Sequence, residues 1–154
     1  KRLDAGEISR DGFLGNDPRP VAEIIAEDNA VIEAAGLTAA ALANLLDKIH
    51  AAADRGQENT VELYGGKVSA LCTEVRGRIP CPFGDGALAH KAVIDVRFDG
   101  QTLRLTPLGI HMLRAHRFLQ GRGSPFRIEP AALIALYRLA KAGADADAGA
   151  APRH

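Results

Sequence analysis

The sequence predicts an α+β domain in which helices and antiparallel strands occupy separate stretches of the chain. Apolar residues recur at helical spacing in the first third, alternate at strand spacing in the middle, and return to helical spacing near the end. Two pairs, Gly65-Gly66 and Asp99-Gly100, separate strand-like runs and are typical of tight hairpins. Hairpins join antiparallel strands, so this order favours an α+β fold over a parallel sheet.

Length and composition fit a single domain. The chain has 154 residues, of which 47% are hydrophobic and 25% are charged, and a chain of this length buries about two thirds of its unfolded surface. We place the domain at residues 1–142, with residues 1–16 as an extended N-terminal arm. Residues 143–154, rich in Ala, Asp and Gly, are predicted to be a flexible tail because they cannot bury enough apolar surface to become ordered.

Two helices are predicted before residue 57. Asp17 and Pro18 provide an N-cap and a first helical residue for the first helix, which ends at Gly36. Thr38 begins the second helix, and Gly56 follows its end. The short connection between them predicts an antiparallel helical hairpin.

Asp28 lies within the apolar face of the first predicted helix, seven residues after Val21. A buried carboxylate needs a partner, and an arginine from the second half of the chain could supply one. Alternatively, this part of the helix face lies near solvent, which is the interpretation that we favour.

The second half of the chain is predicted to form two hairpins and then two helices. Strand-like runs flank the turns in residues 60–75 and 92–106. The stretch between them contains "RGRIPCPFGDG", residues 76–86, which we interpret as a loop. Thr106-Pro107 begins a third helix and Pro130 begins a fourth.

Charge is distributed unevenly although the net charge is zero. Residues 1–66 carry 6 Lys/Arg against 12 Asp/Glu, whereas residues 67–141 carry 12 against 5, and nine of those twelve are arginines. Arginine suits carboxylates and phosphates. We therefore predict an Arg-rich face for an anionic ligand, nucleic acid or an acidic protein surface, unless the two halves neutralise each other. The predicted contacts are Arg76, Arg78, Arg117, Arg122 and Arg127.

The strongest candidate for chemistry is a cysteine held between two prolines, Pro80-Cys81-Pro82. The prolines fix the backbone and so present the side chain in one place. Histidines follow on the third predicted helix at H-x₄-H spacing, which zinc sites use. The predicted metal ligands are Cys81, His90, His111 and His116, with Cys72 as an alternative that fits the core better. This sulfur and nitrogen set suits zinc or another transition metal.

Three other functions remain open at this point. The Cys81-Pro82 dipeptide could ligate haem, whose propionates the arginines would suit. Cys81 could instead be the nucleophile of a thiol-dependent enzyme, with a histidine as base. The chain could also be an anion-binding or nucleic-acid-binding module with structural histidines. The sequence has no nucleotide-binding loop and no catalytic triad signature, which favours binding over catalysis.

The sequence also indicates a cellular setting. No apolar run approaches the ~20 residues of a membrane span, and the first twelve residues lack the apolar core of a signal peptide. Two cysteines are too few for a disulfide framework. We therefore predict a reduced, cytoplasmic setting and no membrane partner.

Overall fold

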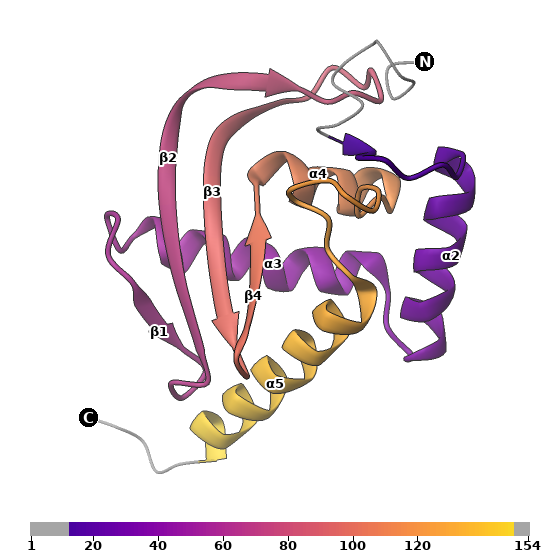
Figure 1. Ribbon diagram of the computed structural model, residues 1–154. Coiled ribbons are helices and arrows are strands. Elements are labelled where there is room, and N and C mark those ends of the chain that lie inside the picture. The colour runs from indigo at the N-terminus through magenta and orange to yellow at the C-terminus, as the bar shows by residue number, and fades with distance from the viewer. Residues whose placement is uncertain (1–12, 150–154) are drawn as a thin grey trace.

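The computed structural model of the protein describes residues 13–149 and confirms the α+β fold (Figure 1). Two helices precede a four-stranded antiparallel sheet of order β1-β2-β3-β4, and two helices follow it. The elements are α2 (Val21–Ala34), α3 (Ala39–Asp54), β1 (Val61–Leu63), β2 (Val68–Pro80), β3 (Leu88–Phe98), β4 (Gln101–Leu105), α4 (Pro107–His116) and α5 (Pro130–Gly149).

The two predicted chain ends lie only partly within the described residues. Residues 1–12 of the predicted arm lie outside them, whereas Phe13 and Leu14 are buried. At the other end, α5 continues six residues past its predicted stop at Gly143, where the backbone of Tyr64 lies against the helix. Residues 150–154 of the predicted tail lie outside the described part of the chain.

Helix α2 begins later than predicted, at Val21, because of Pro20. A residue that precedes proline is disfavoured in helical conformation, so Arg19 cannot belong to the helix. Asp17 is therefore not the N-cap. Its carboxylate instead accepts bonds from the guanidinium of Arg19, at 2.6 and 2.9 Å, and from the backbone N–H of Arg122. Asp17 thus joins the start of α2 to the loop after α4.

The predicted antiparallel pairing of α2 with α3 is wrong. Gly36 ends α2 in a left-handed conformation, as predicted, but the chain then turns through 88°. The two helices pack against different elements. Helix α2 packs against α5, whereas α3 crosses the sheet (Figure 1). Among the described residues, no single helix has the length and apolarity of a membrane span, and α2 and α3 meet that test only together, across the bend.

The sheet is built from successive hairpins, and both predicted turns are present. Asp99-Gly100 forms a two-residue turn between Phe98 and Gln101, with both turn residues in the left-handed region. Gly65-Gly66 lies at the centre of a longer connection between β1 and β2. The stretch 76–80, predicted as loop, is instead the end of β2, because it continues to pair with β3.

A β-bulge interrupts β2 where it passes Lys91. The register shifts between Val75 and Arg78, and Gly77 adopts a φ of 106°, which disfavours any residue with a Cβ. Bulges bend a strand and change the direction of its side chains. The paired ends of β2 and β3 curve away from the main sheet beyond this point and carry the cysteine loop (Figure 1).

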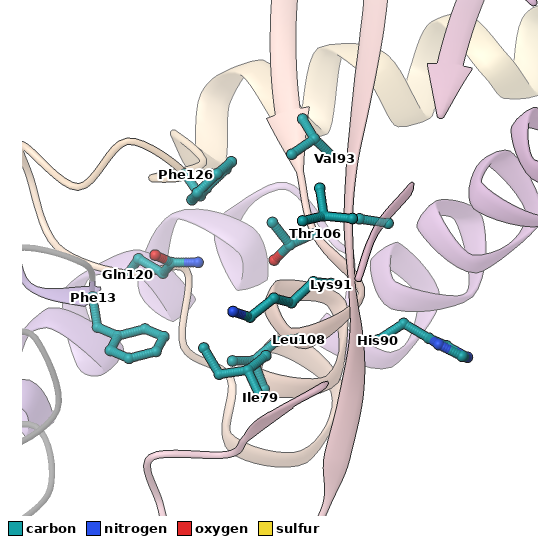
Figure 2. Close-up of a pocket in the computed structure, with 11 residues that line it drawn as sticks. Phe13, Ile79, His90, Lys91, Val93, Thr106, Leu108, Gln120 and Phe126 are labelled. Carbon is teal, nitrogen blue, oxygen red and sulfur yellow. The ribbon is translucent and has the colours of Figure 1, made fainter. Parts of the chain in front are cut away.

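Buried side chains form two clusters. The larger one lies between the sheet and helices α3, α4 and α5. The smaller one contains Phe13, Ile24, Cys81, Met112 and Phe118 and packs the cysteine loop against α2 and α4. A cavity of about 330 Å³ lies beside the smaller cluster (Figure 2).

A buried ion pair joins the two halves of the chain. Asp28 is buried, so the favoured interpretation of this position as solvent-exposed is wrong and the alternative is correct. Arg127 donates to both carboxylate oxygens of Asp28, with the second bond at 3.0 Å, and also to the carbonyl of Gln120 at 2.8 Å. The side chains of Arg127 and Asp28 are only 7% and 6% exposed.

We expect Asp28→Asn to lower the free energy of unfolding by about 3 kcal/mol, because it leaves the buried guanidinium of Arg127 without its main partner. Chemical denaturation at neutral pH measures this loss. Asp47→Asn, which removes the exposed ion pair with Arg114, is the control and should cost at most about 1 kcal/mol. An equal effect of the two variants would contradict a structural role for the Asp28–Arg127 pair.

We also expect Asp17 to contribute to acid sensitivity. The guanidinium of Arg19 and the N–H of Arg122 hold the pKa of Asp17 well below its usual value of 3.8. The stability that the ionised Asp17 contributes is therefore fully present above its usual pKa. It is lost as the pH falls toward the lowered pKa of the folded state. Asp17→Asn should be less stable at neutral pH and lose less stability between pH 5 and about pH 2. Urea unfolding at each pH measures the free energy of unfolding. If this free energy falls equally with pH in Asp17→Asn and in the native chain, Asp17 does not cause the acid sensitivity.

Candidate metal centre

The loop between β2 and β3 forms one half of the candidate site. The N–H of Cys81 donates to the carbonyl of Ala87, and the N–H of Gly84 donates to the carbonyl of Cys81. Within this turn, Asp85 accepts a 2.9 Å bond from the N–H of Ala87. Two prolines and three internal bonds therefore fix both the thiol and the carboxylate.

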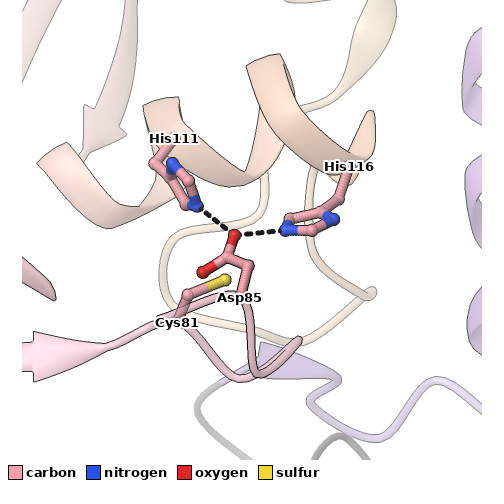
Figure 3. Close-up of side chains that lie close together, drawn as sticks. All are labelled: Cys81, Asp85, His111 and His116. Carbon is pink, nitrogen blue, oxygen red and sulfur yellow. Dashed lines mark hydrogen bonds and ion pairs between the residues drawn. The ribbon is translucent and has the colours of Figure 1, made fainter. Parts of the chain in front are cut away.

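Helix α4 forms the other half. Thr106 caps its first turn by accepting a bond from the N–H of Gly109, and Pro107 begins the helix as predicted. The helix ends at His116, because Arg117 adopts a left-handed conformation. His111 and His116, five residues apart, lie about 140° apart around an ideal helix axis. They still reach one point, because the carboxylate of Asp85 lies between their rings (Figure 3).

The four side chains converge closely. Nε2 of His111 and Nε2 of His116 each lie 2.7 Å from Oδ2 of Asp85. Cys81 completes the group, and one ligand atom from each residue lies within 4.8 Å of all the others. We call Cys81, Asp85, His111 and His116 the CDHH cluster. Asp85 lies 26 residues before His111 and 31 before His116, so the fold brings the cluster together.

The charge states of the cluster follow from its contacts. The N–H of Ala87 and the rings of His116 and His111 hold the pKa of Asp85 well below its usual range. The carboxylate is therefore ionised and only accepts, so each histidine donates its Nε2–H to it. Burial raises the pKa of the Cys81 thiol, and the charge of Asp85 raises it further. Cys81 is thus a neutral thiol in the absence of a cation.

Aromatic packing fixes one of the histidines. The ring of Phe83 stacks on His116 with centroids 4.0 Å apart and planes at 10°. The ring of Phe118 contacts Phe83 edge to face, with centroids 5.6 Å apart. The cysteine loop thus contacts His116 twice, through the stacked ring of Phe83 and the carboxylate of Asp85.

The donor atoms fit a transition metal ion. One sulfur, one carboxylate oxygen and two imidazole nitrogens are all zinc ligands. In a tetrahedral zinc site, nitrogen and oxygen ligands lie about 3.3 Å apart. The two nitrogen–oxygen distances would have to widen by about 0.6 Å, which side-chain rotation can supply. The CDHH cluster could therefore hold a metal ion.

Three of the four predicted metal ligands come together, and one does not. His90 is exposed on β3 opposite Arg78, and Figure 2 shows its ring directed away from Lys91 and Leu108. Cys72 is buried in the main core, paired with Ile94. The fourth residue of the cluster is Asp85, which was not among the predicted ligands. The signal that could have identified it is a lone carboxylate between two glycines, four residues after Cys81.

Of the five arginines predicted to bind an anion, one is buried in an ion pair and four are exposed. Arg127 is buried and bound to Asp28, so its guanidinium is not available to a ligand. Arg76 and Arg78 are exposed at the bulge of β2, and Arg117 and Arg122 are exposed in the loop after α4. Within residues 13–149, no carboxylate pairs with the guanidinium groups of these four arginines.

Comparison with protein-family models, with curated proteins and with solved structures finds no significant match to the chain.

Proposed function

We propose that the protein is a small metal-binding protein that holds zinc, or a similar transition metal ion, in the CDHH cluster. The observation that carries the proposal is the convergence of four ligand atoms of suitable chemistry within 4.8 Å. Without a cation, two Nε2–H groups and the Cys81 thiol surround the carboxylate of Asp85. A metal ion would replace these protons, because it binds the thiolate and the neutral imidazole nitrogens.

The arrangement favours a structural role for the metal. Four protein ligands complete a tetrahedral zinc site and leave no position for substrate. Two ligands come from the loop between β2 and β3 and two from α4, so a bound ion would join the curved end of the sheet to the helix. Both cysteines are free, and a reducing compartment such as the cytoplasm would keep Cys81 available as a ligand.

The alternative functions of Cys81 have less support. Cys81 is 2% exposed, which leaves no open face for a haem macrocycle. The raised pKa of the buried thiol also opposes a role as a thiolate nucleophile. A single ion fits the small space among the four ligand atoms better than either alternative.

We propose in addition that an anionic ligand, nucleic acid or acidic protein surface binds the exposed arginines. Arg76, Arg78, Arg117 and Arg122 are the four of the five predicted contacts that have no carboxylate partner within the described residues. The first two flank the bulge that leads to the cysteine loop. Free guanidinium groups bind phosphate or carboxylate through two parallel hydrogen bonds.

We expect tag-free protein, loaded with zinc and dialysed, to retain about one zinc ion per chain, measured by elemental analysis. Cys81→Ser and Asp85→Ala should each lower the zinc content. Chelation should lower the melting temperature of the native chain, because metal binding contributes to folding stability.

His90→Gln is the matched control for the metal experiment. It removes a histidine near the cysteine loop that lies outside the CDHH cluster, so its zinc content should equal that of the native chain. Equal zinc loss in His90→Gln and Cys81→Ser, or no retained zinc in the native chain, would reject the CDHH cluster as the metal site.

For the anionic partner, we expect a single-stranded oligonucleotide to bind with an affinity that falls as the salt concentration rises. The double variant Arg76→Gln/Arg78→Gln should reduce that salt dependence, because it removes two phosphate contacts. Arg104→Gln is the control, since Arg104 already pairs with Asp95. Fluorescence anisotropy measures the binding. A salt slope that the double variant leaves unchanged would exclude nucleic acid at this surface.

A further inference from the structure

The cavity beside the smaller cluster is bounded by β2, β3, the start of α4 and the loop that follows α4 (Figure 2). Its volume, about 330 Å³, lies at the lower end of the range for small-molecule sites, about 300–1,000 Å³. Phe13, Ile79, Val93, Leu108 and Phe126 give it a mainly apolar wall. No member of the CDHH cluster lines it, so its chemistry is separate from that of the proposed metal centre.

Gln120 presents a polar group to this apolar space. The residue is 3% exposed and adopts a left-handed φ of 72°, which is unusual for a residue other than glycine. Arg127 holds its carbonyl, and the hydroxyl of Ser124 donates to its Oε1 at 2.7 Å. Ser124 Oγ also accepts a bond from the N–H of Phe126. The amide is thereby oriented, with its nitrogen on the cavity side.

Within residues 13–149, the nitrogen of this amide donates to no acceptor. Figure 2 shows Nε2 of Gln120 directed into the cavity. Within the described residues, the hydrogen bonds of the Gln120 side chain comprise only the one that Oε1 accepts from Ser124. A ligand that offers an acceptor at this point would form a hydrogen bond that this nitrogen does not make to the described residues.

Lys91 contributes a positive charge to the same space. Its side chain runs along the bulge of β2, where a Cβ on Gly77 would lie 3.7 Å from Cδ of Lys91. Figure 2 shows its ammonium group directed toward the cavity, on the side of Ile79 and Gln120. No carboxylate pairs with Lys91 in the part of the chain that the structure describes. The start of α4, at Thr106 and Leu108, adds the positive end of a helix dipole.

We propose that the cavity binds a small apolar carboxylate, such as a medium-chain fatty acid. Its carboxylate accepts hydrogen bonds from Nζ of Lys91 and Nε2 of Gln120, and its apolar part packs among Phe13, Val93 and Phe126. A charge-assisted hydrogen bond from an ammonium group favours a carboxylate over a neutral acceptor. At about 30 Å³ per water-sized group, the cavity accommodates roughly eleven non-hydrogen atoms, close to the size of decanoate.

Decanoate, decanol and decylamine, titrated below their micelle concentrations into the full chain, test this proposal by isothermal titration calorimetry. Decanoate should bind at least ten-fold more tightly than decanol, and decylamine should not bind, because Lys91 repels it. Lys91→Met keeps most of the length of the side chain and removes the charge. This variant should bind decanoate at least ten-fold more weakly than the native chain does, and its affinity for decanol should be unchanged. Lys67→Met, in the hairpin between β1 and β2, is the matched control and should bind decanoate as the native chain does.

A second variant tests the apolar part of the site. Val93→Phe should fill the cavity and abolish binding of both decanoate and decanol, while circular dichroism shows a folded chain. The proposal is overturned if decanoate does not bind, if it binds no better than decanol, or if Lys91→Met or Val93→Phe leaves its affinity unchanged. Zinc-loaded and chelator-treated protein are titrated separately. Absence of zinc binding with retained decanoate binding would reject only the metal site, and the converse would reject only the carboxylate site.

Discussion

The ion pair between Asp28 and Arg127 connects helix α2 to the loop that follows α4, and both candidate sites depend on that loop. Arg127 also binds the backbone carbonyl of Gln120, the residue whose amide faces the cavity. The same loop begins with Phe118, whose ring supports Phe83 against His116. A buried pair of charges contributes little net stability, because desolvation offsets the attraction. The pair instead fixes the position of the loop, because Arg127 bonds both carboxylate oxygens of Asp28.

In the fold, the unevenly distributed charges of the two halves are partly paired with each other and partly exposed. Part of the charge is neutralised internally, because Asp28 binds Arg127 and Asp47 binds Arg114 across the two halves. The other part remains at the surface, where Arg76 and Arg78 have no carboxylate partner among the described residues. Sequence counts cannot separate these contributions, since pairing depends on which side chains the fold brings together.

Local signals in the sequence predicted local features of the fold, and long-range contacts determined the rest. The Asp99-Gly100 turn and the stop at Gly36 were predictable because each depends on the backbone preference of one or two residues. The extension of β2 through residues 76–80 depends on pairing with β3, which residues 76–86 do not reveal. The candidate site divides in the same way. Pro80-Cys81-Pro82 and the two helical histidines indicated three ligands, but the choice of Asp85 over His90 depends on how the loop folds onto α4.

Helix α4 explains how two chemically distinct sites can lie close together without sharing a side chain. Its first turn, with Leu108, borders the cavity, and the turns that follow carry His111 and His116. The end of β2 has the same division, since Ile79 lines the cavity and Cys81 belongs to the CDHH cluster two residues later. The Gly77 bulge makes this possible, because it curves the paired strands over the smaller cluster while Lys91 remains at the cavity. One irregularity in a strand thus positions both the thiol and the ammonium group.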